Sequence, residues 1–359
     1  MARLSLALAA AILPVAAAAQ DRGITVISWG GDFSAAQVRA LNQPFTQDTG
    51  IAVQMVDAGD PALPLKAQAE AGNVTTDVAS VGSAEATQLC DSGVIRPIDP
   101  AILTPAPDGT PAVQDFMPGA LGDCFVATDI YSTVIGWDDR ALDGAAPPQS
   151  VADFFDLQKY PGRRGVLKEP RFTLEMALMA DGVPAAQVYE TLSTPQGVDR
   201  AFAKLDTIKD QAVFWEAGAQ PRQLLADGEV AMAMVYNGRV FAARVEDDVP
   251  LSMMWDGQVY EIEGWVIPTD APHPAEALEY VVHTTTAQAM ARFASQISYG
   301  LPRLSAEALL GTYKDTDLPV APHLPTAPQN MANALQFDHD FWVDHQTELY
   351  ERFARWVAS

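Results

Sequence analysis

Aromatic and polar residues suited to a ligand site recur where apolar runs predict the end of a strand and the start of a helix. Three turns share this character: Trp29 before Gly30-Gly31, then Gly82-Ser83, and Tyr236-Asn237-Gly238-Arg239. In an open α/β sheet, ligands bind beyond the carboxyl ends of the strands, and helix N-termini favour anionic groups. A site that combines stacking on Trp29 with polar contacts at the other turns is one interpretation. The other is structural, with Trp29 in the core and Ser83 as an ordinary helix cap.

The residue patterns that enzymes and metal sites need are missing or badly spaced. The sequence has no G-x-S-x-G, no H-E-x-x-H, no P-loop and no G-x-G-x-x-G. His339 and His345 lie among aspartates, but six residues apart they would face different sides of a helix. We expect surface or capping roles for them, with a metal site as the alternative. We therefore expect no enzyme activity, no cofactor and no metal, and a secreted hydrolase or transferase remains the alternative.

The composition limits the class of partner. The 359 residues include 46 acidic and 22 basic side chains, for a formal net charge of −24. Such a charge argues against nucleic acid or an anionic membrane surface as partner. Without residues 1–19, about 340 residues remain, more than one hydrophobic core usually holds, which predicts two lobes.

Residues 1–19 are typical of a secretory signal peptide. Arg3 supplies the positive start, residues 4–15 an apolar run, and Ala17-Ala18-Ala19 a small-residue cleavage site. The run is too short for a comfortable membrane anchor, which needs about 20 residues. We expect an exported, periplasmic protein.

Cys90 and Cys124 are the two cysteines of the chain. In an exported protein an even count favours a disulfide, and two separate buried thiols are the alternative. The bridge would close a loop of about 35 residues and contribute on the order of 3–4 kcal/mol.

Strand and helix patterns alternate along the chain, which predicts parallel strands with crossover helices. The main predicted elements are strands at 24–27, 51–56, 77–81, 212–215 and 230–235, and helices at 35–49, 63–71, 84–90, 151–157 and 338–358. Residues 125–137 predict a long strand that passes between lobes. Residues 251–255 and 263–268 predict two strands on either side of Asp256-Gly257.

The mature chain resembles the solute receptors of bacterial ABC importers, in particular the spermidine/putrescine-binding branch. Besides the three turns above, the resemblance is carried by the segments Tyr131-Ser132-Thr133-Val134-Ile135-Gly136-Trp137-Asp138, Tyr260-Glu261-Ile262-Glu263-Gly264-Trp265 and Ser298-Tyr299-Gly300-Leu301-Pro302. It implies an α/β, two-lobed periplasmic-binding-protein-like fold of type II. Each lobe would be a mostly parallel sheet flanked by helices, with the ligand in the cleft between lobes.

The resemblance also implies the lobe boundaries. Lobe 1 would take residues 20–129 plus 263–302, and lobe 2 residues 133–258 plus 306–359. The hinge crossovers would lie at 130–132, 259–262 and 303–305. Both cysteines then fall in lobe 1.

Carried over position by position, the family pattern implies a mixed pocket. Trp29, Tyr236 and Tyr299 match pocket aromatics, and Glu263 and Glu169 match two acidic positions. Two departures from a polyamine pocket are Ala84, where the family has tyrosine, and Phe172, where it has an acid.

The charges at the ends of the pocket decide the ligand class. A diamine needs a carboxylate at each end and aromatic walls between. Glu263, with Glu261 beside it, and Arg239 at the other end would instead suit a zwitterion such as γ-aminobutyrate. Arg239 also has another interpretation, in which it pairs with Glu261 or Asp227 outside the cleft.

We therefore expect a monomeric receptor for a polyamine, an ω-amino acid or a related zwitterion, with Ser83 and Asn237 as neutral hydrogen-bonding groups. Its partner would be the permease of an ABC transporter. A receptor for ferric or another ion with the same fold, using Tyr236 and Tyr299, remains an alternative.

Overall fold

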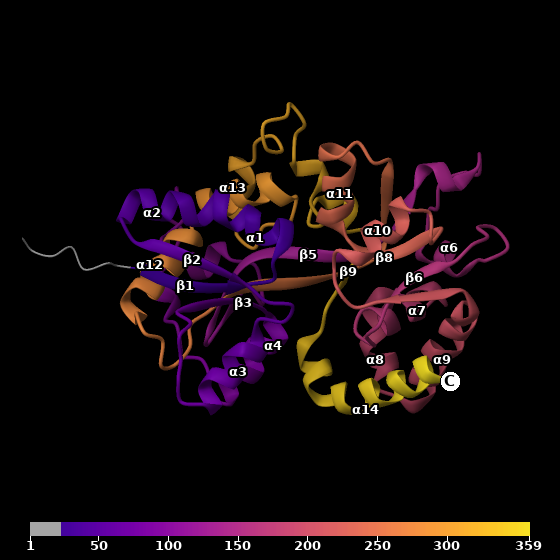
Figure 1. Cartoon of the computed structure of the whole chain (residues 1–359), viewed down its shortest axis with the longest axis horizontal. Coiled ribbons are helices and arrows are strands. Elements are labelled where there is room, and N and C mark those ends of the chain that lie inside the picture. The colour runs from indigo at the N-terminus through magenta and orange to yellow at the C-terminus, as the bar shows by residue number, and fades with distance from the viewer. Residues whose placement is uncertain (1–22) are drawn as a thin grey trace, which may run out of the picture.

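The computed structural model describes residues 23–359, so the predicted signal peptide at residues 1–19 lies outside the described residues. The chain forms one mixed sheet, covered by helices and drawn out into two halves (Figure 1). The strand order is β2-β1-β3-β9-β5-β8-β6-β7, with β10 beside β9 and β4 beside β5. The strands are β1 Gly23–Ser28, β2 Ala52–Asp57, β3 Val78–Gly82, β4 Leu121–Gly122, β5 Phe125–Asp138, β6 Arg164–Leu167, β7 Ala212–Trp215, β8 Met232–Tyr236, β9 Leu251–Val266 and β10 Leu335–Gln336.

The first half contains the parallel strands that the sequence predicts. β1 pairs in parallel with β2 and with β3. Its helices are α1 Gly31–Gln37, α2 Gln43–Thr49, α3 Ala62–Glu70, α4 Ser83–Asp91, α5 Ala112–Asp115, α12 Pro274–Thr284 and α13 Ala287–Ile297. The helix predicted over 35–49 begins earlier, at Gly31, and contains a π-helical turn at Val38–Asn42. Gly30 has a φ of 80°, which lets the chain turn sharply between β1 and α1.

The two longest strands cross the middle of the molecule side by side (Figure 1). β5 was predicted as a strand passing between lobes. β9 corrects the prediction of two strands at 251–255 and 263–268, because it is one strand of 16 residues. Gly257 adopts a φ of 72°, and this freedom lets the strand bend where a break was predicted while it pairs with β5 on both sides.

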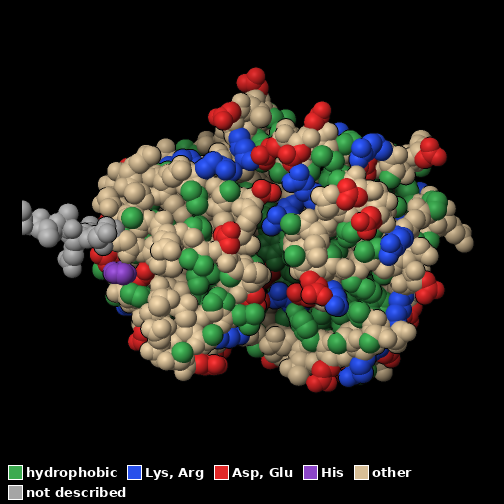
Figure 2. Space-filling view, viewed as in Figure 1, with side chains coloured by type: hydrophobic (Ala, Val, Ile, Leu, Met, Phe, Trp, Pro, Cys, Tyr) green, Lys and Arg blue, Asp and Glu red, His purple; other side chains and the backbone are tan. Residues whose placement is uncertain are grey.

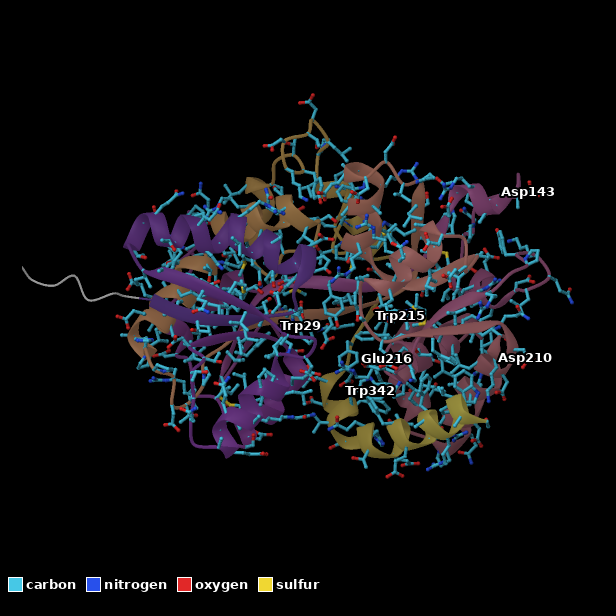
Figure 3. The ribbon with its side chains drawn as sticks, in the orientation of Figure 1. Trp29, Asp143, Asp210, Trp215, Glu216 and Trp342 are labelled. Carbon is cyan, nitrogen blue, oxygen red and sulfur yellow. A yellow bond between two sulfur atoms is a disulfide. The ribbon has the colours of Figure 1, made fainter. Side chains whose placement is uncertain are left out.

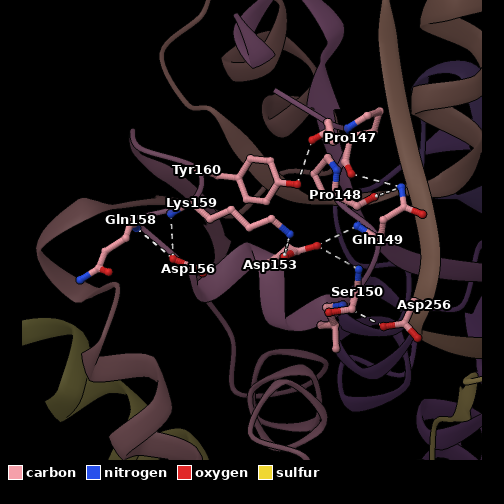
Figure 4. Close-up of polar contacts among 12 residues, drawn as sticks. Pro147, Pro148, Gln149, Ser150, Asp153, Asp156, Gln158, Lys159, Tyr160 and Asp256 are labelled. Atoms are coloured by element: carbon pink, nitrogen blue, oxygen red, sulfur yellow. Dashed lines mark hydrogen bonds and ion pairs between the residues drawn. The ribbon is translucent and has the colours of Figure 1, made fainter. Parts of the chain in front are cut away.

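The second half holds β6, which pairs in parallel with β7 and β8. Its helices are α6 Val151–Phe155, α7 Thr173–Ala180, α8 Val188–Leu192, α9 Pro195–Asp206, α10 Gln220–Ala226, α11 Asn237–Glu246 and α14 His339–Ala358. Figure 4 shows how α6 begins. Asp153 accepts from the Ser150 N–H (3.3 Å) and from Lys159 (2.8 Å), and Asp256 in β9 accepts from the Val151 N–H (2.9 Å). The capping box of Ser150 and Asp153 thus closes the start of α6, and Asp256 ties that start to the bend of β9.

Buried apolar side chains form one large cluster in each half. The first includes Phe45, Trp265 and Phe293, and the second includes Phe154, Trp215 and Trp342. Tyr131, in β5, packs against both clusters. The two large clusters are therefore joined where β5 and β9 cross, and two smaller clusters lie beside them.

The segment between α13 and α14 consists of short 3₁₀ turns at Leu304–Leu309, Ala321–His323 and Pro328–Asn330. Arg303 is fully buried and pairs with Asp115 of the first half at 2.7 Å. Further along, β10 pairs with β9 at Val259 and Tyr260 before the chain enters α14.

The predicted disulfide between Cys90 and Cys124 is present, and it ties the end of α4 to the start of β5. None of the helices within residues 23–359 combines the length and the apolar character needed to cross a bilayer.

Candidate functional site

A cavity of about 290 Å³ opens between the two halves. It lies where the central hollow is visible on the face drawn in Figure 2. Its lining residues come from the ends of β1, β6, β7 and β8, from both crossing strands and from the turn after α13: Trp29, Gly30, Gly31, Phe33, Gly59, Tyr131, Glu169, Arg171, Phe172, Glu216, Ala217, Gly218, Ala219, Tyr236, Arg239, Glu263 and Tyr299. The carboxyl ends of parallel strands thus meet at one point, as expected for a ligand site in this class of sheet.

Two sides of the cavity are built by turns that face each other. Trp29 comes from the β1 side and Glu216 from the β7 side, and Figure 3 shows both near the middle of the molecule. After Glu216, the chain packs so closely that a Cβ on Gly218 would lie 2.7 Å from the Tyr236 ring. Only glycine fits at that position without moving the aromatic wall.

Three tyrosine rings form one wall of the cavity. Tyr131 lies 5.3 Å from Tyr236, 6.2 Å from Tyr299 and 6.2 Å from Phe172, measured between ring centroids. Trp29 also lines the cavity, and its indole N–H is buried with no hydrogen-bond partner in residues 23–359. Such a wall can hold an alkyl chain and can stabilise a cation over the ring faces.

The acidic side of the cavity is Glu263, in β9. Its side chain is buried, and it makes no ion pair with any residue between 23 and 359. Burial raises the pKa of Glu263, and the neighbouring carboxyls of Asp129, Glu261 and Glu85 raise that pKa further. A buried carboxyl of this kind gains most from a cationic partner.

Two arginines line the cavity. Arg171 pairs with Glu85 and, at 3.4 Å, with Glu169. Arg239 has no carboxylate partner within residues 23–359, and its Nε–H is buried without an acceptor. Its guanidinium lies close enough to α1 that a Cβ on Gly31 would be 3.7 Å from Nη1. Of the two arginines, Arg239 is the one left to bind an anionic group.

Comparisons with known proteins agree with this geometry. Residues 40–326 match the family of bacterial extracellular solute-binding proteins. The chain is 41% identical over 343 residues to the gamma-aminobutyric acid-binding protein of Pseudomonas aeruginosa, covering 96% of this chain and 93% of that protein. The chain belongs to the bacterial extracellular solute-binding proteins.

More distant relatives and solved structures support the same family. The spermidine/putrescine-binding periplasmic protein of Escherichia coli is 24% identical over 241 residues, 65% of each chain. The structure of PBP MotA from A. tumefaciens B6, in complex with glucopine, has a TM-score of 0.82 at 30% identity and covers 93% of this chain and 99% of that chain. The structure described as the Atu4243-GABA receptor has a TM-score of 0.78 at 31% identity and covers 94% and 98%.

Family membership confirms three predictions. The protein is a solute-binding protein of the ABC-transporter class, it has the two-lobed α/β fold of periplasmic binding proteins, and it is a receptor without enzyme activity. Its family is extracellular, and the Escherichia coli relative is periplasmic.

In this solute-binding protein, six predicted ligand residues line the cavity: Trp29, Glu169, Tyr236, Arg239, Glu263 and Tyr299. Glu169 is already engaged, because it pairs with Arg171 and accepts from the Tyr350 hydroxyl at 3.1 Å. Ser83, Asn237 and Glu261 do not line the cavity.

The last three residues lie outside the cavity lining, and two of them contact residues that support or line it. Asn237 is fully buried, accepts from the Ser132 N–H at 3.0 Å and donates to the Ser298 carbonyl at 3.0 Å. It thereby fixes the turn that carries Tyr299. Glu261 accepts from the Tyr131 hydroxyl, and Ser83 is the first residue of α4.

The structure also locates Phe172 and Ala84, the two residues that depart from the pattern of a polyamine pocket. Phe172, where the resemblance to polyamine receptors implies an acid, lines the cavity and is almost fully buried. Ala84 is buried in the second apolar cluster, where it contacts side chains of the other half.

Tyr131 and Arg171 line the cavity and were missed from the sequence. Tyr131 lies in the long strand predicted to pass between lobes, and a strand that crosses a cleft must expose residues to it. The prediction of that crossing strand was therefore a sequence signal that could have identified Tyr131. Arg171 lies two residues beyond Glu169 in a turn that carried no periodic signal.

The histidines form no metal site in the part of the chain that the structure describes. His339 lies 3.0 Å from Asp340 on the exposed start of α14, and His345 stacks on Phe341. No group of three or more histidines, cysteines or carboxylates within residues 23–359 is placed to hold an ion.

Proposed function

We propose that this receptor captures an ω-amino acid such as γ-aminobutyrate and delivers it to the permease of an ABC transporter. The ammonium group would bind Glu263, the carboxylate would bind Arg239, and the alkyl chain would lie against Trp29, Tyr236 and Tyr299. The observation that carries the proposal is the unpaired Arg239 in the same cavity as the unpaired Glu263.

A zwitterion fits these two groups better than a diamine does. Both ends of a polyamine are cationic, so one of them would meet Arg239 or Phe172 in place of a carboxylate. A zwitterion gives each of these two groups a partner of opposite charge, and charge-assisted hydrogen bonds are the strong ones. The relative named for γ-aminobutyrate shares 41% of its residues with this chain, against 24% for the relative named for spermidine and putrescine.

The volume of the cavity favours a small ligand. About 290 Å³ lies at the lower limit of the roughly 300–1,000 Å³ that is common for ligand pockets. A larger hollow, of about 390 Å³, lies beside Leu304–Leu309, but its Arg303 is taken up by the buried ion pair with Asp115.

We further propose that the receptor works by hinge closure of its two lobes. Lobe 1 would comprise residues 23–129 plus 263–334 and lobe 2 residues 133–258 plus 337–359, with crossovers at 130–132 and 259–262. The third crossover we now assign to β10 and not to 303–305, because Ala306 packs in the first apolar cluster and Phe337 in the second. The receptor would act as an exported monomer that presents one lobe to each half of the permease.

A thermal-shift panel tests the ligand class. γ-Aminobutyrate should raise the melting temperature of the purified receptor, and putrescine, which has the same four-carbon chain, should not. A shift with putrescine and none with γ-aminobutyrate would favour the polyamine alternative, and a shift with ferric ion alone would favour the ion receptor.

Glu263→Gln tests the ammonium contact directly. It should weaken γ-aminobutyrate binding more than tenfold, because a hydrogen bond to a charged group contributes about 1.5–3 kcal/mol. An unchanged dissociation constant in titration calorimetry would remove Glu263 from the ligand contacts.

A further inference from the structure

A second carboxylate, Asp129, lies directly opposite Glu263. The register of the antiparallel strands β5 and β9 pairs these two residues. Residues that are opposite in an antiparallel pair point to the same face, with Cβ atoms about 4.5–5.5 Å apart. Asp129 is 1% exposed and Glu263 is 6% exposed.

The sequence forces this pairing through a β-bulge. Ala127 pairs with Gly264 and Asp129 with Glu263, so Thr128 is the extra residue. A Cβ on Gly264 would lie 2.3 Å from the Val126 carbonyl oxygen, so only glycine permits the bulge. The Thr128 hydroxyl donates to Asp129 Oδ2 at 2.7 Å and helps to hold the carboxyl in place.

No cation within residues 23–359 neutralises this pair of carboxylates. Asp129 Oδ1 is buried without a hydrogen-bond partner, and neither carboxyl forms an ion pair in that range. Two buried carboxylates side by side cannot both ionise readily, and their titration belongs to the pair.

The surroundings add further negative charge. The titratable and charged groups that face the pair come from every neighbouring element: Glu261 in β9, Tyr131 in β5, Glu85 in α4, Glu169 and Arg171 after β6, Tyr236 at the end of β8, Arg239 in α11, and Tyr299 after α13. Of the two arginines, Arg171 is committed to Glu85 and Glu169. Burial raises the pKa of both Asp129 and Glu263, and the charge of Asp129 adds to the effect on Glu263.

We propose that Asp129 and Glu263 form a two-carboxylate pole that holds a proton in the empty receptor and releases it to solvent when the ammonium group of the ligand binds. The proposal rests on the proposed function. Asp129 is a positioning residue here, acting through Glu263. The ligand's own ammonium keeps its proton, because an alkyl amine titrates near pH 10. The released proton therefore comes from the carboxyl pair.

The proposal makes binding dependent on pH. Wherever the empty pair holds a proton that the complex does not, affinity rises with pH, by up to about tenfold per pH unit for one proton. At higher pH, where the empty pair has already lost the proton, the affinity levels off.

Titration calorimetry of the full receptor with γ-aminobutyrate at pH 7 tests the proposal in phosphate and in Tris, which differ in ionisation enthalpy. The difference between the observed enthalpies should correspond to the release of about one proton. Asp129→Asn should reduce the release to less than half. Glu175→Gln, which removes another buried carboxyl that does not line the cavity, should keep the wild-type release.

Two results would overturn the proposal: equal binding enthalpies for the wild type in both buffers, or the same proton release from Asp129→Asn as from the wild type. The wild-type measurement needs no variant, so a variant that fails to fold does not remove the test. An absence of binding heat in both buffers would instead contradict the proposed function, and this proposal with it.

Discussion

Arg171 and Arg239 line the same cavity, and the residues around them differ. Arg171 pairs with Glu85 and Glu169, and its guanidinium lies over the rings of Phe172 and Phe337 at 5.9 and 5.6 Å. Arg239 lines the cavity without a carboxylate partner in residues 23–359, and its Nε–H has no acceptor. An arginine that its own protein neutralises can stabilise the fold, whereas one left unpaired in a cavity is available to a ligand.

The same contrast holds for the buried carboxyls. Burial opposes the ionisation of Glu85, but the charge and hydrogen bond of Arg171 lower its pKa on balance. Glu263 lacks such a partner, and its pKa is raised by burial and by neighbouring carboxyls. Within residues 23–359, Arg239 and Glu263 thus line the cavity without a partner of opposite charge. A zwitterion would supply such a partner to each of them.

The largest effect is expected from Arg239→Met. We expect the affinity for γ-aminobutyrate to fall more than 100-fold, because two charge-assisted hydrogen bonds contribute about 1.5–3 kcal/mol each. The free energy of unfolding of the empty receptor should stay the same or rise, since a half-buried guanidinium without a carboxylate partner in residues 23–359 is removed. Calorimetry and denaturant unfolding measure the two quantities.

Arg239→Lys is the matched control. It keeps the charge and loses the planar pair of donors, so the affinity should fall by less than in Arg239→Met. A loss of stability in Arg239→Met with unchanged affinity would reverse the roles assigned to the two arginines.

A smaller effect is expected from Arg171→Met, and on a different quantity. Removing one partner of a buried ion pair costs about 3–5 kcal/mol, and partial exposure of this network reduces the figure to about 2 kcal/mol. The side chains of Arg171 and Glu85 are 20% and 21% exposed. We therefore expect a lower free energy of unfolding in urea, with Arg239→Met as the comparison. Wild-type stability in Arg171→Met would contradict the structural role.

The smallest effect concerns Glu175, a fully buried carboxyl in α7. Burial raises its pKa from 4.5 to about 7, against the hydrogen bonds from Trp342 and Tyr189. Between those two pH values the folded state binds more protons than the unfolded state, so stability falls as the pH rises from about 4.5 to about 7.

Glu175→Gln should make this decline shallower, by on the order of 1 kcal/mol. Urea unfolding of the ligand-free receptor at pH 5 and pH 7 measures it. An equally steep decline in the variant would show that Glu175 is already ionised near pH 5.

Much of the fold could be predicted because its signals are local. The glycine turn after β1, the alternation of strands and helices, and the run of β-branched residues in β5 each depend on neighbours in the sequence. The break predicted at Asp256-Gly257 was wrong because β5, more than 100 residues away, pairs with β9 on both sides of the bend. The local sequence around Asp256-Gly257 does not show that a distant strand pairs on both sides of the bend.

The site could be predicted only in part, for the same reason. Trp29, Tyr236 and Tyr299 stand at turns that a sequence pattern can locate. Asp129 faces Glu263 through a bulge that depends on Gly264, which lies 135 positions after Asp129 in the sequence. A local sequence pattern cannot predict that register. Asn237 belongs to a predicted turn, but its amide is directed to Ser132 and Ser298, away from the cavity.

The contact between Arg239 and a ligand carboxylate is tested most directly by a double-mutant cycle in calorimetry. The cycle combines wild-type receptor and Arg239→Met with γ-aminobutyrate and 4-aminobutanamide, which keeps the ammonium group and replaces the carboxylate by a neutral amide. The proposal predicts that the wild type strongly prefers γ-aminobutyrate, that the variant does not discriminate, and that the coupling free energy is at least about 2 kcal/mol. Equal discrimination by both proteins would contradict it.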